Sequence, residues 1–119
     1  MQYMILIYGD EKRWEKMSQG DGQKMVADYM QYTNELGATG MMRAGSQLRP
    51  VATATTLREK GGKLITTDGP FAETKEQLAG YYLIDAPDLD SALKWAGKCP
   101  GVRDGSVEVR PLPEMPAPK

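Results

Sequence analysis

The amino-acid sequence predicts an α+β fold, a ferredoxin-like sheet with an inserted β-hairpin. Three observations support this prediction. Alternating and helical patterns follow one another as strand, helix, strand, hairpin, strand, helix, strand, which amounts to two βαβ-like units with a hairpin between them. Residues 2–8 and 78–86 are apolar on both faces, as in strands that are covered on both sides. The Gly61-Gly62 pair suits the two-residue turn of a hairpin.

The first part of the chain predicts a strand followed by a long helix. Residues 2–8 form the strand, and a loop or short helical turn follows it. Residues 18–38 place apolar side chains three and four apart, which predicts the helix. Ser18 and Asp21 are expected to form a capping pair at its start. Its predicted buried stripe comprises Met25, Val26, Tyr29, Met30, Thr33 and Leu36.

The middle of the chain predicts two strands that flank the hairpin, and then a second helix. The strands are expected over residues 41–48 and 78–86, and the hairpin over residues 54–69. Asp88 has the position and side chain of a helix N-cap. The buried stripe of this second helix is predicted to comprise Leu89, Ala92, Leu93 and Ala96.

The last part of the chain predicts a final strand and a tail. Residues 106–112 alternate, with two valines on one face and Glu108 and Arg110 on the other. The sequence therefore predicts a single domain over residues 1–112. Residues 113–119 are expected to form an extended, Pro-rich C-terminal tail.

The second face of the predicted sheet needs a cover. Its two-faced strands are apolar there, and the chain has no third long helix to pack on them. A second copy of the same sheet is the simplest cover, which predicts a homodimer packed sheet to sheet about a two-fold axis. The alternative is that the hairpin folds back over the sheet.

Composition excludes several classes of protein. A chain of 119 residues fits one domain, and its net charge of −1, with no basic block, argues against a nucleic-acid binder. No apolar run approaches the roughly 20 residues that a membrane helix needs. With the single cysteine Cys99 and no pattern of a signal peptide at the N-terminus, the sequence predicts a cytoplasmic protein with no membrane partner.

The absence of histidine is the most restrictive feature of the composition. It removes the commonest general base, the Ser-His and Cys-His nucleophile pairs and most zinc sites. Cys99 is expected at the C-terminal end of the second helix, where the helix dipole disfavours a thiolate. Acid–base chemistry is left to Asp, Glu, Lys or Tyr, and the sequence predicts no cofactor and no metal.

Residues 67–85, "TDGPFAETKEQLAGYYLID", resemble the signature of the DGPF-motif branch of the YCII-related family. The segments "MQYMILIYGDE", "TATTLREKGGKLITTDGPF" and "CPGVRDGSVEVRPL" are similar to that branch in order and spacing, so the resemblance covers nearly the whole chain. It implies a dimeric α/β barrel. The motif positions that carry over are Asp68, Gly69, Pro70 and Phe71.

The same resemblance implies two kinds of function. Some members of the branch resemble proteins encoded near, or fused to, extracytoplasmic-function sigma factors, which implies a sigma factor as a partner. A related branch includes a muconolactone dehydrochlorinase and is associated with a His-Asp pair. This chain has no histidine, so no catalytic histidine carries over.

The DGPF motif has a functional and a structural interpretation. In the first, Asp68 is an acid–base or ligand-anchoring carboxylate, the catalytic candidate, held by a rigid Gly-Pro turn at the mouth of a cleft. In the second, Asp68 accepts hydrogen bonds from nearby backbone N–H groups, Gly69 is extended because Pro70 follows it, and Phe71 packs in the core.

Carboxylates and tyrosines after the motif are further candidates. Glu73 and Glu76 fall on one side of the chain if residues 71–80 contain a helical turn. Two close carboxylates can raise one pKa or hold a divalent cation, and the alternative is a solvated turn. Tyr81 and Tyr82 are predicted to point to opposite faces, one under the helices and one toward the dimer interior, as a ligand donor or as a packed aromatic.

Polar residues on the edge strands complete the set of candidates. Arg110 and Glu108 are expected to pair with each other or with Asp68, and Arg43 and Ser46 are expected to join them. An arginine inside a barrel suits a carboxylate-bearing ligand. The alternative is a structural set of salt bridges near the interface.

Three functions remain open from the sequence. The favoured one is a small-molecule site in the cleft of a homodimer, which binds a carboxylate-bearing ligand and acts as a lyase- or isomerase-type enzyme that lacks histidine. The second is a non-enzymatic interaction module linked to sigma-factor regulation. The third is a dimer whose DGPF motif is structural only.

Overall fold

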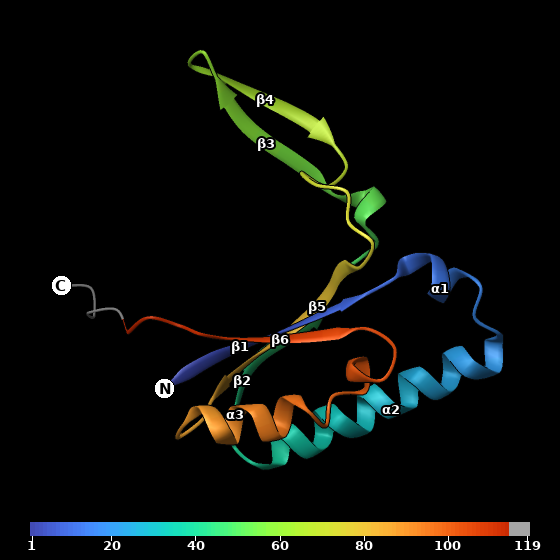
Figure 1. Ribbon diagram of the computed structural model, residues 1–119, viewed down its shortest axis with the longest axis vertical. Coiled ribbons are helices and arrows are strands. Elements are labelled where there is room, and N and C mark those ends of the chain that lie inside the picture. The colour runs from blue at the N-terminus through green and yellow to red at the C-terminus, as the bar shows by residue number, and fades with distance from the viewer. Residues whose placement is uncertain (115–119) are drawn as a thin grey trace.

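The computed structural model describes residues 1–114 and contains an open antiparallel sheet with helices on one face (Figure 1). The sheet comprises β1 (Gln2–Gly9), β2 (Met42–Gln47), β5 (Gln77–Asp85) and β6 (Ser106–Pro111). The strand order is β2-β5-β1-β6, and all neighbouring strands are antiparallel. Along the chain these are the second, third, first and fourth strands of the sheet, an order that matches the ferredoxin-like arrangement. The predicted α+β class is confirmed.

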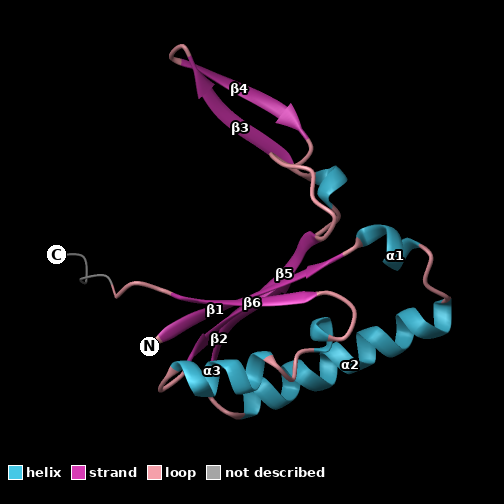
Figure 2. Ribbon diagram, in the orientation of Figure 1, coloured by secondary structure: helices cyan, strands magenta, loops and turns pink. Residues whose placement is uncertain are grey.

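Helices α2 (Gln19–Ala38) and α3 (Leu89–Ala96) cover the same face of the sheet (Figure 2). A short helix α1 (Glu11–Glu15) and the 3₁₀ turns η1 (Val51–Thr53) and η2 (Pro100–Val102) lie in the connections. The inserted hairpin consists of β3 (Thr55–Lys60) and β4 (Lys63–Asp68). In the described part of the chain β2 and β6 are free edges, so a single chain closes no barrel.

The hydrophobic core lies between the sheet and the two helices. Tyr3, Ile5 and Ile7 point from β1 into it and are at most 6% exposed. They pack with Leu36 of α2 and Ile84 of β5, both 0% exposed. Because every second residue of β1 enters this core, the intervening residues of the strand face the opposite side of the sheet.

The buried stripe predicted for α2 is confirmed in part: Leu36 is buried and Tyr29 packs against the core, but Val26 and Met30 are not buried. Val26 and Met30 are 59% and 62% exposed, although the pattern places them inside. The buried residues are Tyr32 and Leu36. The Tyr32 hydroxyl donates to the Trp95 carbonyl over 2.9 Å, a contact between α2 and α3 on the buried side of the helix.

The buried stripe of helix α3 also differs in part from the predicted one. Ala92 and Ala96 are buried as predicted, but Leu89 and Leu93 are each 48% exposed. Small alanines bring the helix close to the sheet, so the larger side chains at the margins of the stripe stay at its rim. The N-cap is as predicted, since the Asp88 carboxylate accepts from the Ser91 N–H over 2.8 Å.

The hairpin, residues 55–68, is here called the arm. It stands away from the sheet, on the side opposite α2 and α3 (Figure 1). Its turn residues Gly61 and Gly62 have φ angles of +60° and +78°, which glycine adopts without strain. No residue of β3 or β4 is buried. The alternative in which the hairpin folds back over its own sheet is therefore wrong.

The predicted tail, residues 113–119, lies outside the described residues except for positions 113 and 114. The chain leaves the sheet at Leu112, whose N–H donates to the Gln2 carbonyl over 2.9 Å. None of the helices within residues 1–114 has the length and apolar character needed to cross a membrane.

Candidate functional site

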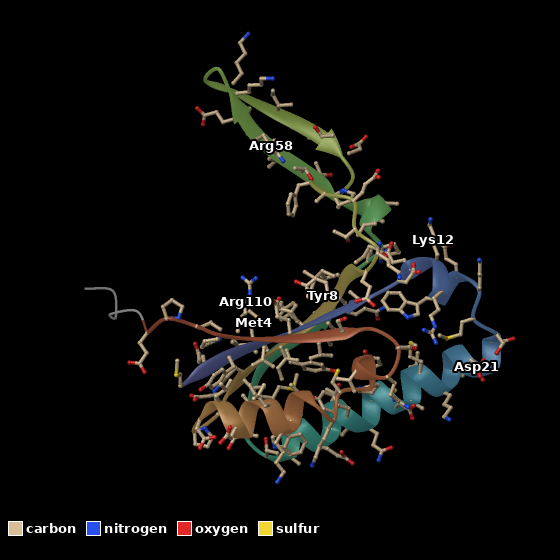
Figure 3. The ribbon with its side chains drawn as sticks, in the orientation of Figure 1. Met4, Tyr8, Lys12, Asp21, Arg58 and Arg110 are labelled. Carbon is tan, nitrogen blue, oxygen red and sulfur yellow. The ribbon has the colours of Figure 1, made fainter. Side chains whose placement is uncertain are left out.

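The sheet face opposite α2 and α3 carries the candidate site and is here called the open face. Its centre is apolar: Leu6 lies between Tyr81 and Glu108, and Met4 lies between Leu83 and Arg110 on the neighbouring strands. Directly paired residues of antiparallel strands share a face. Figure 3 shows Met4, Tyr8 and Arg110 on this side of the sheet. The residues that the register assigns to it include Met4, Leu6, Tyr8, Ala44, Ser46, Leu78, Tyr81, Leu83, Ser106, Glu108 and Arg110.

Three polar side chains form a connected group at the β1–β6 side of the open face. The Tyr8 hydroxyl donates to Glu108 Oε1 over 3.4 Å, and Arg110 Nε lies 3.4 Å from Glu108 Oε2. Arg110 and Glu108 are therefore partners of one another, within a single strand, rather than of Asp68. The Arg110 side chain is 70% exposed and approaches Glu108 through Nε, and within residues 1–114 its Nη groups make no hydrogen bond.

Burial raises the pKa of the Tyr8 hydroxyl, and the charge and hydrogen bond of Glu108 raise it further, while Arg110 opposes them. Glu108 opposes ionisation because a phenolate beside a carboxylate would be a repelling pair. Tyr8 therefore stays protonated at neutral pH and presents a hydroxyl donor next to a carboxylate and a guanidinium.

The two adjacent tyrosines of β5 have different environments. Tyr81 lies on the open face opposite Leu6. Tyr82 lies under the helices, 8% exposed, with its hydroxyl 2.7 Å from Thr33 Oγ1 and its ring edge-on to Tyr32 at 5.4 Å. Tyr82 therefore belongs to the core, and only Tyr81 is placed to meet a ligand on the open face.

Arg43 and Ser46 do not join Arg110, contrary to expectation. They lie on β2, while Arg110 lies on β6, and the two central strands separate these edges. Arg43 donates to the Gly40 carbonyl over 2.7 Å and lies 3.6 Å from Asp85 Oδ2. Ser46 is on the open face, and its hydroxyl donates to the neighbouring backbone carbonyl of residue 47 over 3.0 Å.

The DGPF turn lies at the base of the arm, where Thr55 pairs with Asp68. Gly69 makes the local hydrogen bonds: its N–H donates to the Ala54 carbonyl over 2.7 Å, and its carbonyl accepts from Thr56 Oγ1 over 2.8 Å. Gly69 has φ of +99° instead of an extended angle, because the chain reverses direction here as it leaves the arm. Pro70 follows this glycine and is exposed.

The structural interpretation of the motif does not match a single chain. Phe71 is 78% exposed, so its expected place in the core is wrong; the arm holds the motif away from the core. Within residues 1–114 the Asp68 carboxylate accepts no hydrogen bond and forms no ion pair. The predicted backbone bonds to Asp68 are therefore not made.

Residues 70–76 form bends and irregular chain without a helical turn, the condition on which Glu73 and Glu76 would share one side. Glu73 is exposed. Glu76 Oε1 accepts from Ser106 Oγ over 2.7 Å, which connects the start of β5 to β6. Glu76 is therefore engaged in a contact between strands, and Glu73 is not part of that contact. No group of three or more His, Cys, Asp or Glu side chains in the described residues is arranged to hold a metal ion.

A groove of about 470 Å³ lies on the other side of the molecule, between α1, α2 and η2. It contains acidic and basic side chains together, and its Arg103 already pairs with Asp28 at 3.0 Å. None of the predicted site residues lines it. Within residues 1–114 no helix covers the open face (Figure 1).

Sequence reasoning did not name Tyr8 or the apolar trio Met4, Leu6 and Leu83 as site residues. The alternation of β1 places Met4, Leu6 and Tyr8 on one face. What the sequence does not reveal is the pairing of β1 with both β5 and β6, which brings these side chains next to Tyr81, Glu108 and Arg110.

Fold and site together define an α+β domain with a bare, partly apolar sheet face and an arm that carries an exposed acidic turn. The YCII-related domain model matches residues 1–116, nearly the whole chain. The chain is also similar to an uncharacterised protein of Rhizobium meliloti (strain 1021), at 40% identity over 114 residues that span 94% of this chain and 92% of the relative. The chain belongs to the YCII-related family.

Proposed function

We propose that the protein is a homodimer that binds a small carboxylate-bearing molecule in a cleft over its open face. The observation that carries this proposal is Arg110, which Glu108 holds through Nε at the border of an apolar surface. Its two Nη groups are free for a bidentate contact with a carboxylate, the geometry for which arginine is best suited.

The dimer provides the enclosure. Apolar side chains at the centre of the open face, which include Leu6 and Leu83, are only partly buried in a single chain. Packing two such faces together removes this surface from water and leaves the polar margin around Arg110 at the mouth of the interface. Two sheets arranged in this way form the dimeric α/β barrel that the family resemblance implies.

The chemistry best supported on this face is a proton transfer of the lyase or isomerase type, without histidine. Tyr8 supplies a protonated hydroxyl, and Glu108 supplies a carboxylate that accepts from it over 3.4 Å. A ligand carboxylate held by Arg110 would place its neighbouring carbon near both groups.

A thermal-shift comparison tests the ligand proposal. Acetate, malonate, succinate and benzoate are added to the wild type and to Arg110→Gln and Arg13→Gln variants, with sodium chloride at matched ionic strength as the reference. At least one carboxylate should raise the melting temperature of the wild type and of Arg13→Gln but not of Arg110→Gln. Arg13 is the matched control because it lines the groove on the other side of the molecule. No shift with any carboxylate, or equal loss in both variants, would refute the proposal.

The second candidate is a non-enzymatic module that binds a sigma factor. The observation in its favour is the apolar surface on and beside the arm, where Leu57, Leu64 and Phe71 are 60%, 70% and 78% exposed. Titration of the dimer with a purified extracytoplasmic-function sigma factor tests it. A complex that Phe71→Glu weakens is the expected result, and the absence of a complex would dismiss this candidate.

A further inference from the structure

Contacts within one chain do not explain why the arm is stable. A two-stranded hairpin alone is only marginally stable in water, and neither β3 nor β4 contains a buried residue. Leu57, Leu64 and Ile65 are 60%, 70% and 41% exposed. An arm of regular strands that exposes these side chains is expected to pack on another surface.

The two faces of the arm differ in charge. The register places two leucines, two acidic residues and two threonines on one face, which are Thr55, Leu57, Glu59, Leu64, Thr66 and Asp68. The other face is basic apart from one isoleucine and two threonines. Its members are Thr56, Arg58, Lys60, Lys63, Ile65 and Thr67.

The whole molecule has more surface than a compact chain of its size. It exposes 8726 Å², roughly 2,300 Å² more than the ~6,400 Å² of a compact monomer of this mass. Its radius of gyration is 16.7 Å, whereas a compact domain of this length has about 13.5 Å. An excess of this size is in the range that one subunit buries in an obligate dimer.

The direction of the arm selects a second copy of the chain as its partner. The sheet is a layer between the helices and the arm, which rises from the β2–β5 end of the sheet on the side of the open face (Figure 1). A second sheet stacked on the open face must therefore lie alongside the arm. By two-fold symmetry the second arm then lies alongside the first subunit.

We infer that the arm of each subunit docks on the other subunit through its Leu57–Leu64 face, so that the Asp68 turn of one chain forms part of the partner's site. Leu57 and Leu64 meet apolar side chains there. The acidic residues of this face complement the positive charge that Arg110 gives to the partner's open face, where its side chain is 70% exposed. Asp68 thereby lies at the margin of the partner's site, and the Nη groups of the partner's Arg110 stay available to the ligand.

This inference rests on the proposed dimer but not on the proposed ligand. If no carboxylate raises the melting temperature but the arm is docked, only the proposed ligand is overturned. If a carboxylate raises the melting temperature but the arm is not docked, only the inference about the arm is overturned. The two experiments therefore fail independently.

Mixed dimers provide the test. Unlabelled chains with a nitroxide at Leu64→Cys are mixed with ¹⁵N-labelled wild-type chains, and line broadening is measured on the labelled chains. Cys99 is 0% exposed, so the label goes to the introduced cysteine. Broadening is expected at open-face residues of the labelled chain. A nitroxide at Asn34→Cys, on the outer side of α2, is the matched control and should leave these signals sharp.

Two results of the mixed-dimer experiment would overturn the inference. If the Leu64→Cys label broadens no signal of the labelled chain, or if no mixed dimer forms, the inference is overturned. A variant in which Asn-Gly replaces residues 57–66 gives an independent measurement, because Thr56 and Thr67 are directly paired and a two-residue turn can join them. Its dimer dissociation constant should rise at least tenfold, and an unchanged constant would contradict a docked arm.

Discussion

At the scale of single residues, Arg110 is both exposed and oriented. Its contact with Glu108 at 3.4 Å lies at a surface where such pairs contribute at most about 1 kcal/mol to stability. The pair therefore contributes little to the stability of the fold and leaves the guanidinium accessible at the border of the open face. Tyr8 belongs to the same arrangement because it donates to the carboxylate that orients Arg110.

Asp85 leads to a prediction about pH. The hydrogen bond from the N-terminal ammonium lowers its pKa most, followed by the charge of that ammonium and then by Arg43. Since the pKa is lower in the folded chain than in the unfolded one, the stability it contributes is present above the unfolded pKa of about 3.9. That stability is lost as the pH falls through the folded pKa.

An Asp85→Asn variant should therefore lose less stability than the wild type when the pH falls below about 4. Urea denaturation of both proteins at a series of acidic pH values measures this. Asp88, whose pKa the Ser91 backbone N–H lowers, keeps some acid sensitivity in the variant. Parallel stability curves for the two proteins would show that Asp85 has no such role.

At the scale of elements, strands and caps could be predicted from the sequence, whereas helix orientation could not. Ser18 and Asp88 cap their helices as expected, with bonds of 3.1 Å and 2.8 Å to backbone N–H groups. Those motifs are local. The orientation of α2 is not local, since its apolar residues occur on more than one side and packing against the rest of the chain decides which of them enter the core.

The orientation of α2 gives the second prediction. Leu36→Ala should reduce the free energy of unfolding by about 2–5 kcal/mol, because Leu36 is 0% exposed and its removal leaves a cavity. Met30→Ala, at a position 62% exposed, should change it by less than about 0.5 kcal/mol. Chemical denaturation of the two variants compares them directly, and similar losses would contradict the observed facing of the helix.

The candidate site shows the same limit of sequence reasoning. Glu108 and Arg110 share a face because strands alternate, and that part follows from the sequence. The sequence does not state that β1 lies between β5 and β6, so the separation of Arg43 from Arg110 was not predictable. Phe71 was expected in the core because large apolar residues are usually buried, but it lies 78% exposed beside an arm that leaves the core.

At the scale of the whole molecule, the two faces of the four-stranded sheet differ. Helices cover one face, and the other face is uncovered and lies on the side of the arm. The covered side has its core of tyrosines and aliphatic residues. The open face combines apolar side chains with Arg110, Glu108 and Tyr8 and has no cover within the described chain. One second copy would cover the open face and both arms at once, which is why the dimer is central to the proposed function.

Sedimentation equilibrium of the wild type, of Leu6→Glu and of Val26→Glu tests this central claim most directly. Leu6 is at the middle of the open face, whereas Val26 is 59% exposed on the outer side of α2 and serves as the control. The wild type and Val26→Glu should have twice the 13.1 kDa mass of the chain, and Leu6→Glu should have the mass of one folded chain. A wild type of 13.1 kDa, or a Leu6→Glu variant that remains a dimer, would contradict the account.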